Sequence, residues 1–130
     1  MNNLLLDSHI LVWWLSGSEK LNDVTANLID TAMIESRVYV STASIWELSI
    51  KEANGKITLP DDFESVVTDC FNIIPITIDD ARNAPTTYTL HKDPFDKMLV
   101  AQASWRSMLL VTADDKILSG ESPASFFDAR

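Results

Sequence analysis

Short apolar runs alternate with helix-forming segments along the chain, and this alternation restricts the fold more than any other feature. The runs at residues 4–6, 38–40, 71–76 and 109–112 have the continuous apolar character of strands buried on both faces of a sheet. A weaker last strand is expected near 126–127. Strands alternating with helices predict a three-layer α/β/α sandwich, with right-handed crossovers and a mostly parallel central sheet of about five strands.

Two of the connecting helices carry specific expectations. In the helix expected at 22–36, the residues predicted to share one side are Val24, Leu28, Ala32 and Met33. A shorter helix is expected to be capped by Asp79 or Asp80 and to end at Pro85, because proline disrupts a helix interior. We assign these two acids no chemical role.

The segment 91–103 opens a helix with two acids. Asp93 is expected to be the N-cap and Pro94 the first helical residue, with Phe95, Leu99 and Ala103 forming a buried stripe. Asp96 then lies in the first turn, where the negative charge interacts favourably with the helix dipole and stabilises the helix by about 0.3–1 kcal/mol. Helix capping alone could therefore explain both carboxylates.

Three further acids fall where this fold brings its elements together. Asp7 follows the first strand, Asp114 follows the strand at 109–112, and Glu47 lies one to two turns into the helix after the second strand. If the first strand is central, these acids and Asp96 face one crevice beyond the carboxyl ends of the strands. Crowded carboxylates resist ionisation unless a cation compensates them, and oxygen ligands favour Mg²⁺ or Mn²⁺. Spacing alone still allows four unrelated surface or capping acids.

Charge and composition exclude several classes of protein. The chain has 10 Lys and Arg against 19 Asp and Glu, and the net charge of −9 argues against a protein that simply coats nucleic acid. A single cysteine, Cys70, excludes an internal disulfide and is compatible with a cytoplasmic location. No window approaches the roughly 20 apolar residues of a membrane span. We expect one domain over residues 1–130.

Four stretches in order resemble the PIN domain of VapC-type toxins. They are residues 4–9 (LLLDSH), 44–47 (SIWE), 91–103 (HKDPFDKMLVAQA) and 110–114 (LVTAD). They are most similar to a small bacterial branch whose helix begins with His-x-Asp-Pro-Phe-Asp, and the resemblance covers nearly the whole chain. It implies a metal-dependent endoribonuclease that hydrolyses RNA by metal-activated water. Such a protein is the toxin of a type II toxin–antitoxin pair, is inhibited by a cognate antitoxin and is expected to form a homodimer.

The resemblance also implies roles for individual residues. The catalytic, metal-binding acids would be Asp7, Glu47, Asp96 and Asp114, with Mg²⁺ or Mn²⁺ as cofactor. Thr112 or Ser8 would orient a metal-bound water through its hydroxyl. Position in the sequence, after Glu47 or beside Asp96, gives the candidate phosphate contacts as Lys51, Lys56, Lys92 and Lys97, and Ser8 is a further candidate substrate contact. The number of metal ions, and whether Asp93 or Asp115 joins them, stays open.

Two alternatives accompany the nuclease hypothesis. A non-catalytic PIN-like module that binds RNA or its antitoxin would show the same sequence pattern. A phosphoacceptor domain is disfavoured because Asp7 has only Ser8 and His9 beside it, without a second acid. The side chains that could stack on unpaired bases are Trp13, Trp14, Trp46 and Trp105, but their helical spacing favours core or dimer contacts.

Overall fold

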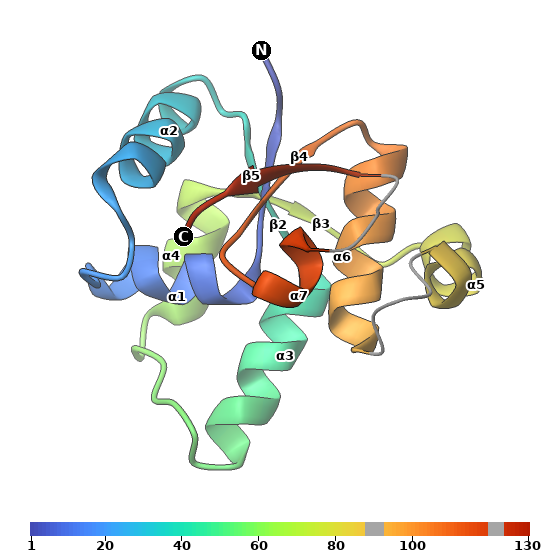
Figure 1. The fold of residues 1–130 in the computed structure, drawn as a ribbon. Helices are drawn as coiled ribbons and strands as arrows, with labels where there is room; N and C mark the ends of the chain where they lie inside the picture. The colour runs from blue at the N-terminus through green and yellow to red at the C-terminus, as the bar shows by residue number, and fades with distance from the viewer. Residues whose placement is uncertain (88–92, 120–123) are drawn as a thin grey trace.

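A computed structural model of the chain describes residues 1–87, 93–119 and 124–130 (Figure 1). In these residues the strands are Leu4–Leu6 (β1), Val38–Ser41 (β2), Asn72–Ile74 (β3), Leu109–Thr112 (β4) and Ser125–Asp128 (β5). They form one sheet in the order β3-β2-β1-β4-β5, and every pairing is parallel. The predicted sheet is therefore confirmed, β1 is central, and β3 is shorter than the expected run at 71–76.

The described helices are Ser8–Ser16 (α1), Asp23–Ile34 (α2), Thr42–Ala53 (α3), Phe63–Cys70 (α4), Ile78–Thr87 (α5), Pro94–Trp105 (α6) and Asp115–Leu118 (α7). Short polar residues begin most of them. The side chains that accept hydrogen bonds from backbone N–H groups at these starts belong to Asp7, Asn22, Ser41, Asp93 and Asp114. These caps satisfy donors that the first helical turn leaves without an intrahelical partner.

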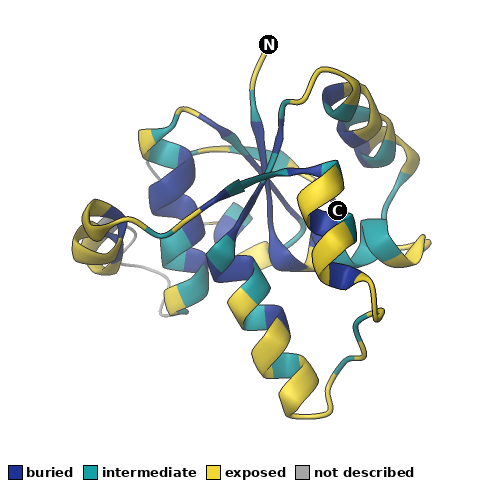
Figure 2. Cartoon of the chain, turned by 180° about the vertical axis from the view of Figure 1, so that it is seen from behind, coloured by how far each residue is buried: buried dark blue, intermediate teal, exposed yellow. Residues whose placement is uncertain are grey.

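The helices cover both faces of the sheet. Right-handed crossovers from β1 to β2 and from β2 to β3 place α1 to α4 on one face. The chain moves outward in the sheet from β1 through β2 to β3, and it then crosses back over these strands to form β4 on the other side of β1. This crossover places α5 and α6 on the other face of the sheet (Figure 1). Each face has its own hydrophobic cluster, one including Leu6, Ile10 and Ile29, the other Leu5, Leu99 and Ile117. The three inner strands β2, β1 and β4 are accordingly mostly buried, while the outer sides of the helices are exposed (Figure 2).

The predicted buried side of α2 is wrong in part. Val24 is 70% exposed, and the residues that α2 buries are Thr25, Ile29 and Ala32. The cause is the N-cap, because Asn22 accepts a hydrogen bond from the Thr25 N–H while its amide group donates to the Ala129 carbonyl. These contacts orient the first turn so that Thr25 faces inward.

The predicted start and end of α5 are also wrong. Thr77 precedes the helix, its N–H donates to Asp80 Oδ2 at 3.0 Å, and the Asp80 N–H donates to Thr77 Oγ1 at 3.1 Å. This reciprocal capping box places Asp80 inside the first turn. The helix also continues past Pro85 to Thr87. A proline so close to the C-terminus removes few intrahelical hydrogen bonds.

Candidate active site

Asp7 and Asp114 are brought together by neighbouring strands at the carboxyl edge of the sheet. Asp7 directly follows β1 and Asp114 lies just beyond β4, and these two strands pair along their length. Thr112 joins the two acids. Its Oγ1 donates a hydrogen bond to Asp7 Oδ2 at 2.8 Å and accepts one from the Asp114 N–H at 3.1 Å. Thr112 is fully buried, so it fixes the position of Asp7.

Glu47 reaches the same edge from α3. The other oxygen of Asp7, Oδ1, accepts a hydrogen bond from the Ser8 N–H at 2.6 Å. Ser8 Oγ donates to Glu47 Oε1 at 2.5 Å. Ser8 is fully buried, and its hydroxyl connects the first turn of α1 to the middle of α3. A continuous series of hydrogen bonds therefore runs from Asp114 through Thr112, Asp7 and Ser8 to Glu47.

Asp96 enters from the start of α6. Asp93 Oδ1 caps this helix by accepting hydrogen bonds from the N–H groups of Phe95 at 2.8 Å and Asp96 at 3.3 Å. Asp96 is only 6% exposed. Burial, followed by the charges of Asp7, Asp93, Asp114 and Glu47, raises the pKa of Asp96 to about 8.

The pKa of Asp7 is also raised. Burial is the main cause and Glu47 adds to it, while Thr112, His9 and the Ser8 N–H act in the opposite direction. Asp7, Glu47, Asp96 and Asp114 therefore share one electrostatic environment beyond the ends of β1 and β4.

The family model of the PIN domain matches residues 4–119, which include all four acids. The chain belongs to the PIN domain family. Among proteins with curated descriptions, none matches its sequence.

Solved structures show the same fold at low sequence identity. VapBC2 from Rickettsia felis bound to a promoter DNA fragment is 15% identical, with a TM-score of 0.71 over 96% of this chain and 97% of that one. DNA-bound VapBC from Salmonella typhimurium is 16% identical, with a TM-score of 0.69 over 100% of both chains. VapBC-5 from Mycobacterium tuberculosis, of the VapBC family of toxin-antitoxin systems, is 18% identical with a TM-score of 0.57 over 97% and 98%.

The donor chemistry of this PIN domain fits a hard divalent cation. The converging groups are carboxylates, and burial together with the charges of the other acids raises the pKa of Asp96. Within residues 1–87, 93–119 and 124–130, no three acidic, His or Cys side chains are already spaced to enclose a metal ion. The oxygens would therefore have to move closer together to share one. The donor set is therefore compatible with a divalent cation, without a preformed cage.

The structure places the other site residues expected from the sequence as follows. Lys51 Nζ lies 3.8 Å from Glu47 Oε2, beside the acids. Lys97 Nζ donates to the Pro85 carbonyl at 3.2 Å, so it packs toward α5. Lys92 lies outside the described residues, as does His91. The hydroxyl groups of Ser8 and Thr112 both donate to carboxylates, and this favours a role in holding the acids over direct contact with water or RNA.

The acids next to the proposed four have structural partners. Asp93 caps α6 through Oδ1. The side chain of Asp115 is 83% exposed and pairs with Arg130 at 3.0 Å. Asp114, unlike Asp115, contributes to the raised pKa of Asp96. Of the two consecutive acids, Asp114 is therefore the one that belongs to the acidic cluster.

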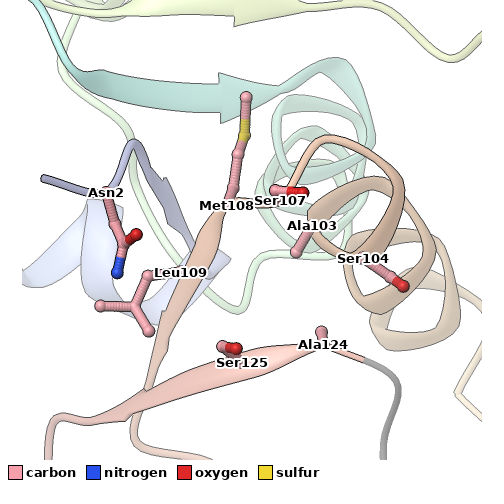
Figure 3. A pocket seen from close by; sticks show the side chains of 8 residues that line it. All are labelled: Asn2, Ala103, Ser104, Ser107, Met108, Leu109, Ala124 and Ser125. Atoms are coloured by element: carbon pink, nitrogen blue, oxygen red, sulfur yellow. The ribbon is translucent and has the colours of Figure 1, made fainter.

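Two cavities lie at opposite edges of the sheet. A cavity of about 210 Å³ beside the acids is lined by His9, Trp13, Ala113 and Asp114. A cavity of about 270 Å³ lies near the amino ends of β4 and β5, where Figure 3 shows the small and polar side chains that line it, including Asn2, Ser107 and Ser125. Among the residues that the structure describes, no acidic side chain lines it. The cavity next to His9 and Trp13 is thus the one associated with the candidate active site.

A buried ionic network was not predicted from the sequence. Arg106 donates to both carboxylate oxygens of Asp80, from Nη1 at 3.1 Å and from Nη2 at 3.0 Å. Gln102 Nε2 also donates to Asp80 Oδ2, at 3.1 Å. Arg106 directly follows α6, about 15 Å along the helix axis from Asp96, so the network is remote from the acids. No local motif links Asp80 with a residue 26 positions away.

Replacing Asp96 with Asn should stabilise the protein when no metal is present. The folded pKa is about 8 and the ordinary value is 3.8, so the folded state binds more protons than the unfolded state between these limits. Stability of the parent therefore falls as pH rises from about 4 to 8. The substitution should reduce this slope, of which Asp7 contributes the rest, and add about 2–4 kcal/mol at pH 8.

Thermal unfolding in EDTA across this pH range measures the effect. Asp115→Asn, which removes an exposed neighbouring charge, should leave the slope unchanged. A mutant at position 96 that melts markedly below the parent at pH 8 would show that the carboxylate is not under repulsion.

Proposed function

We propose that this PIN domain is a metal-dependent endoribonuclease that acts as the toxin of a type II toxin–antitoxin pair. The observation that carries the proposal is the convergence of Asp7, Glu47, Asp96 and Asp114 beyond the carboxyl ends of β1 and β4. Sites of parallel α/β sheets lie at this edge. Membership of the PIN family and the fold shared with VapBC structures support the same assignment.

Each acid has a distinct structural role in the proposed site. Asp7 is the most constrained, because both its oxygens accept hydrogen bonds from neighbouring groups. Glu47 is held by Ser8, and Asp96 is buried at the start of α6. Together with Asp114, these residues would hold Mg²⁺ or Mn²⁺. A bound divalent ion lowers the pKa of water and stabilises the departing oxygen of a phosphodiester.

Lys51 is the described cation that remains a candidate for the RNA backbone. Its Nζ lies 3.8 Å from Glu47 Oε2, beside the acids. In a chain with a net charge of −9, a local cation partly offsets repulsion of the polyanion. Lys51 would therefore position the substrate and take no part in proton transfer.

The proposed protein partner is a cognate antitoxin. The solved structures that share this fold include VapBC toxin–antitoxin assemblies, and two of those described above contain DNA. An antitoxin that covers the acidic edge would block access of RNA to all four carboxylates. A homodimer and a cytoplasmic location remain predictions. No helix among the described residues is long and apolar enough to cross a membrane.

A binding module without catalysis is the second candidate. The observation that favours it is that the described acids form no ready three-ligand group. The same edge could then hold RNA or an antitoxin without hydrolysing a phosphodiester. Measurement of RNA cleavage therefore distinguishes a nuclease from a binding module.

The purified chain should cleave single-stranded RNA internally when Mg²⁺ or Mn²⁺ is added. Cleavage should stop with excess EDTA and return when Mn²⁺ is restored, because the four carboxylates need a cation to act together. Gel analysis of end-labelled RNA measures the products. Tight RNA binding without cleavage at any concentration of either metal would instead identify a binding module. In cells, expression should arrest growth, and co-expression of the protein encoded by an adjacent reading frame should relieve the arrest.

A further inference from the structure

Two aromatic side chains stand at the edge of the acidic cluster. Trp46 directly precedes Glu47 on α3, and Phe95 directly precedes Asp96 on α6. Their rings touch edge to face, with centroids 5.3 Å apart and planes at 72°. The two helices that carry acids to the site therefore also carry an aromatic pair.

Trp46 is open to solvent even though it belongs to this pair. The residue is 60% exposed, so of the core or dimer contacts predicted for the tryptophans, the core contact is wrong for Trp46. Tryptophan is normally among the more buried residues, because its ring has a large apolar surface. Phe95 packs against one part of the indole and restrains its orientation. The exposed ring surface is thus a fixed aromatic platform beside Glu47.

We propose that Trp46 is a substrate-positioning residue that stacks against an unpaired base of the RNA. This inference rests on the proposed nuclease function. A phosphodiester held at the four acids places its neighbouring base at the rim of the site, where Trp46 lies. In a duplex both faces of a base are covered by the adjacent base pairs, whereas an unpaired base offers a free face.

The surroundings of Trp46 favour a base over an apolar protein helix. Glu47 follows it directly, and the Glu47–Lys51 ion pair lies on the same helix, so the aromatic surface is small and bordered by charge. A planar base attached to a phosphate suits such a surface. Ile50, one turn further along α3, is 37% exposed, and a docked protein helix would use both residues. Stacking of a single base requires the ring of Trp46 alone and does not involve Ile50.

Binding of a short labelled RNA tests the proposal. The measurements use Asp7→Asn as the background so that the strand is not cut, and fluorescence anisotropy reports the dissociation constant. Trp46→Ala should weaken binding of the single strand by about 5- to 100-fold, the range expected for losing one stacked base. Trp46→Phe should retain most of the affinity, because a smaller ring still stacks. The same strand annealed to its complement should bind weakly to all variants.

Two substitutions serve as controls. Trp105→Ala removes another exposed tryptophan at the opposite end of α6 and should leave affinity unchanged. Ile50→Ala should also have no effect if the platform holds a base.

The remaining outcomes are each decisive. Unchanged RNA affinity in Trp46→Ala overturns the stacking role, while metal-dependent cleavage by the parent would leave the nuclease proposal intact. If Trp46→Ala and Ile50→Ala both abolish self-association and RNA affinity is unchanged, the stacking role is overturned. The surface around Trp46 then binds a second copy of the chain. If the parent cuts no RNA but Trp46→Ala still loses affinity for the single strand, the platform stands and the nuclease proposal fails.

Discussion

Replacing Asp7 with Asn should reduce metal-dependent RNA cleavage by about 10³-fold or more, equivalent to roughly 4 kcal/mol in the activation free energy. Asp7 is buried at the centre of the acidic cluster, and its oxygens are fixed by Thr112 and Ser8. Asparagine has nearly the same shape but no negative charge, so the fold should persist while the affinity for a divalent cation falls. Initial rates with saturating Mn²⁺ measure the loss, and circular dichroism checks the fold.

Thr112→Val provides a second variant at the same site. It removes the hydroxyl that holds Asp7 and keeps the side-chain volume, and a 10- to 100-fold loss is expected from disturbing a group that orients a metal ligand. Asp115→Asn is the matched control, because this acid is exposed and pairs with Arg130. Its cleavage rate should stay near that of the parent. Parental activity in a folded Asp7→Asn protein would remove Asp7 from the proposed site.

Replacing Asp80 with Ala should destabilise the protein by about 2–4 kcal/mol at neutral pH. The substitution leaves the guanidinium of Arg106 without its carboxylate partner and removes an acceptor from Gln102 and from the Thr77 N–H. Arg106 retains partial access to water, so the loss should lie toward the lower part of the range for breaking a buried pair. Urea unfolding at pH 7 measures the effect.

The stabilisation from Asp80 should also depend on pH. Burial by itself would raise the pKa of Asp80, but hydrogen bonds from Arg106, Thr77 and Gln102 together lower it to about 2. Because the folded pKa is depressed below the ordinary 3.8, the contribution is complete above about pH 4 and disappears as pH falls toward 2. The difference between parent and Asp80→Ala should therefore shrink in acid. Asp79→Ala, which removes the adjacent exposed acid, should change stability by less than about 0.5 kcal/mol. An Asp80→Ala protein as stable as the parent at pH 7 would show that the network has no net effect.

Local sequence patterns determined most of the secondary structure. The apolar runs at β1, β2 and β4 read as strands because their residues are buried on both faces. The start of α6 was predicted correctly because Asp93 and Pro94 define a helix start through their own backbone chemistry. The error in α2 arose where a distant partner acted. Asn22 orients α2 partly through the penultimate residue Ala129, and periodicity in α2 contains no information about that contact. The error in α5 was local, because Thr77 and not Asp79 or Asp80 precedes the helix.

For the four acids of the candidate site, local sequence patterns predicted the positions, whereas contacts between distant residues decided the hydrogen bonds. Their places at strand ends and helix starts were available from the sequence, and the parallel arrangement predicted a common edge. Their hydrogen bonds could not be predicted from the sequence, because Ser8 and Glu47 are 39 residues apart and Thr112 and Asp7 are 105 residues apart. Those links changed the expected role of both hydroxyl groups, from orienting water to holding carboxylates.

The sequence by itself determined the succession of strands and helices along the chain, the caps of most helices other than α5, and the candidate acidic residues, since each depends on neighbouring residues and on patterns of two to four positions. Only the tertiary structure decided that β1 is central, that Asp80 is buried against Arg106, and that Trp46 is exposed beside Glu47. The physical reason is that burial and electrostatic environment are set by groups far away in the chain. The raised pKa of Asp96 is the clearest case, because its causes include carboxylates from three other parts of the polypeptide.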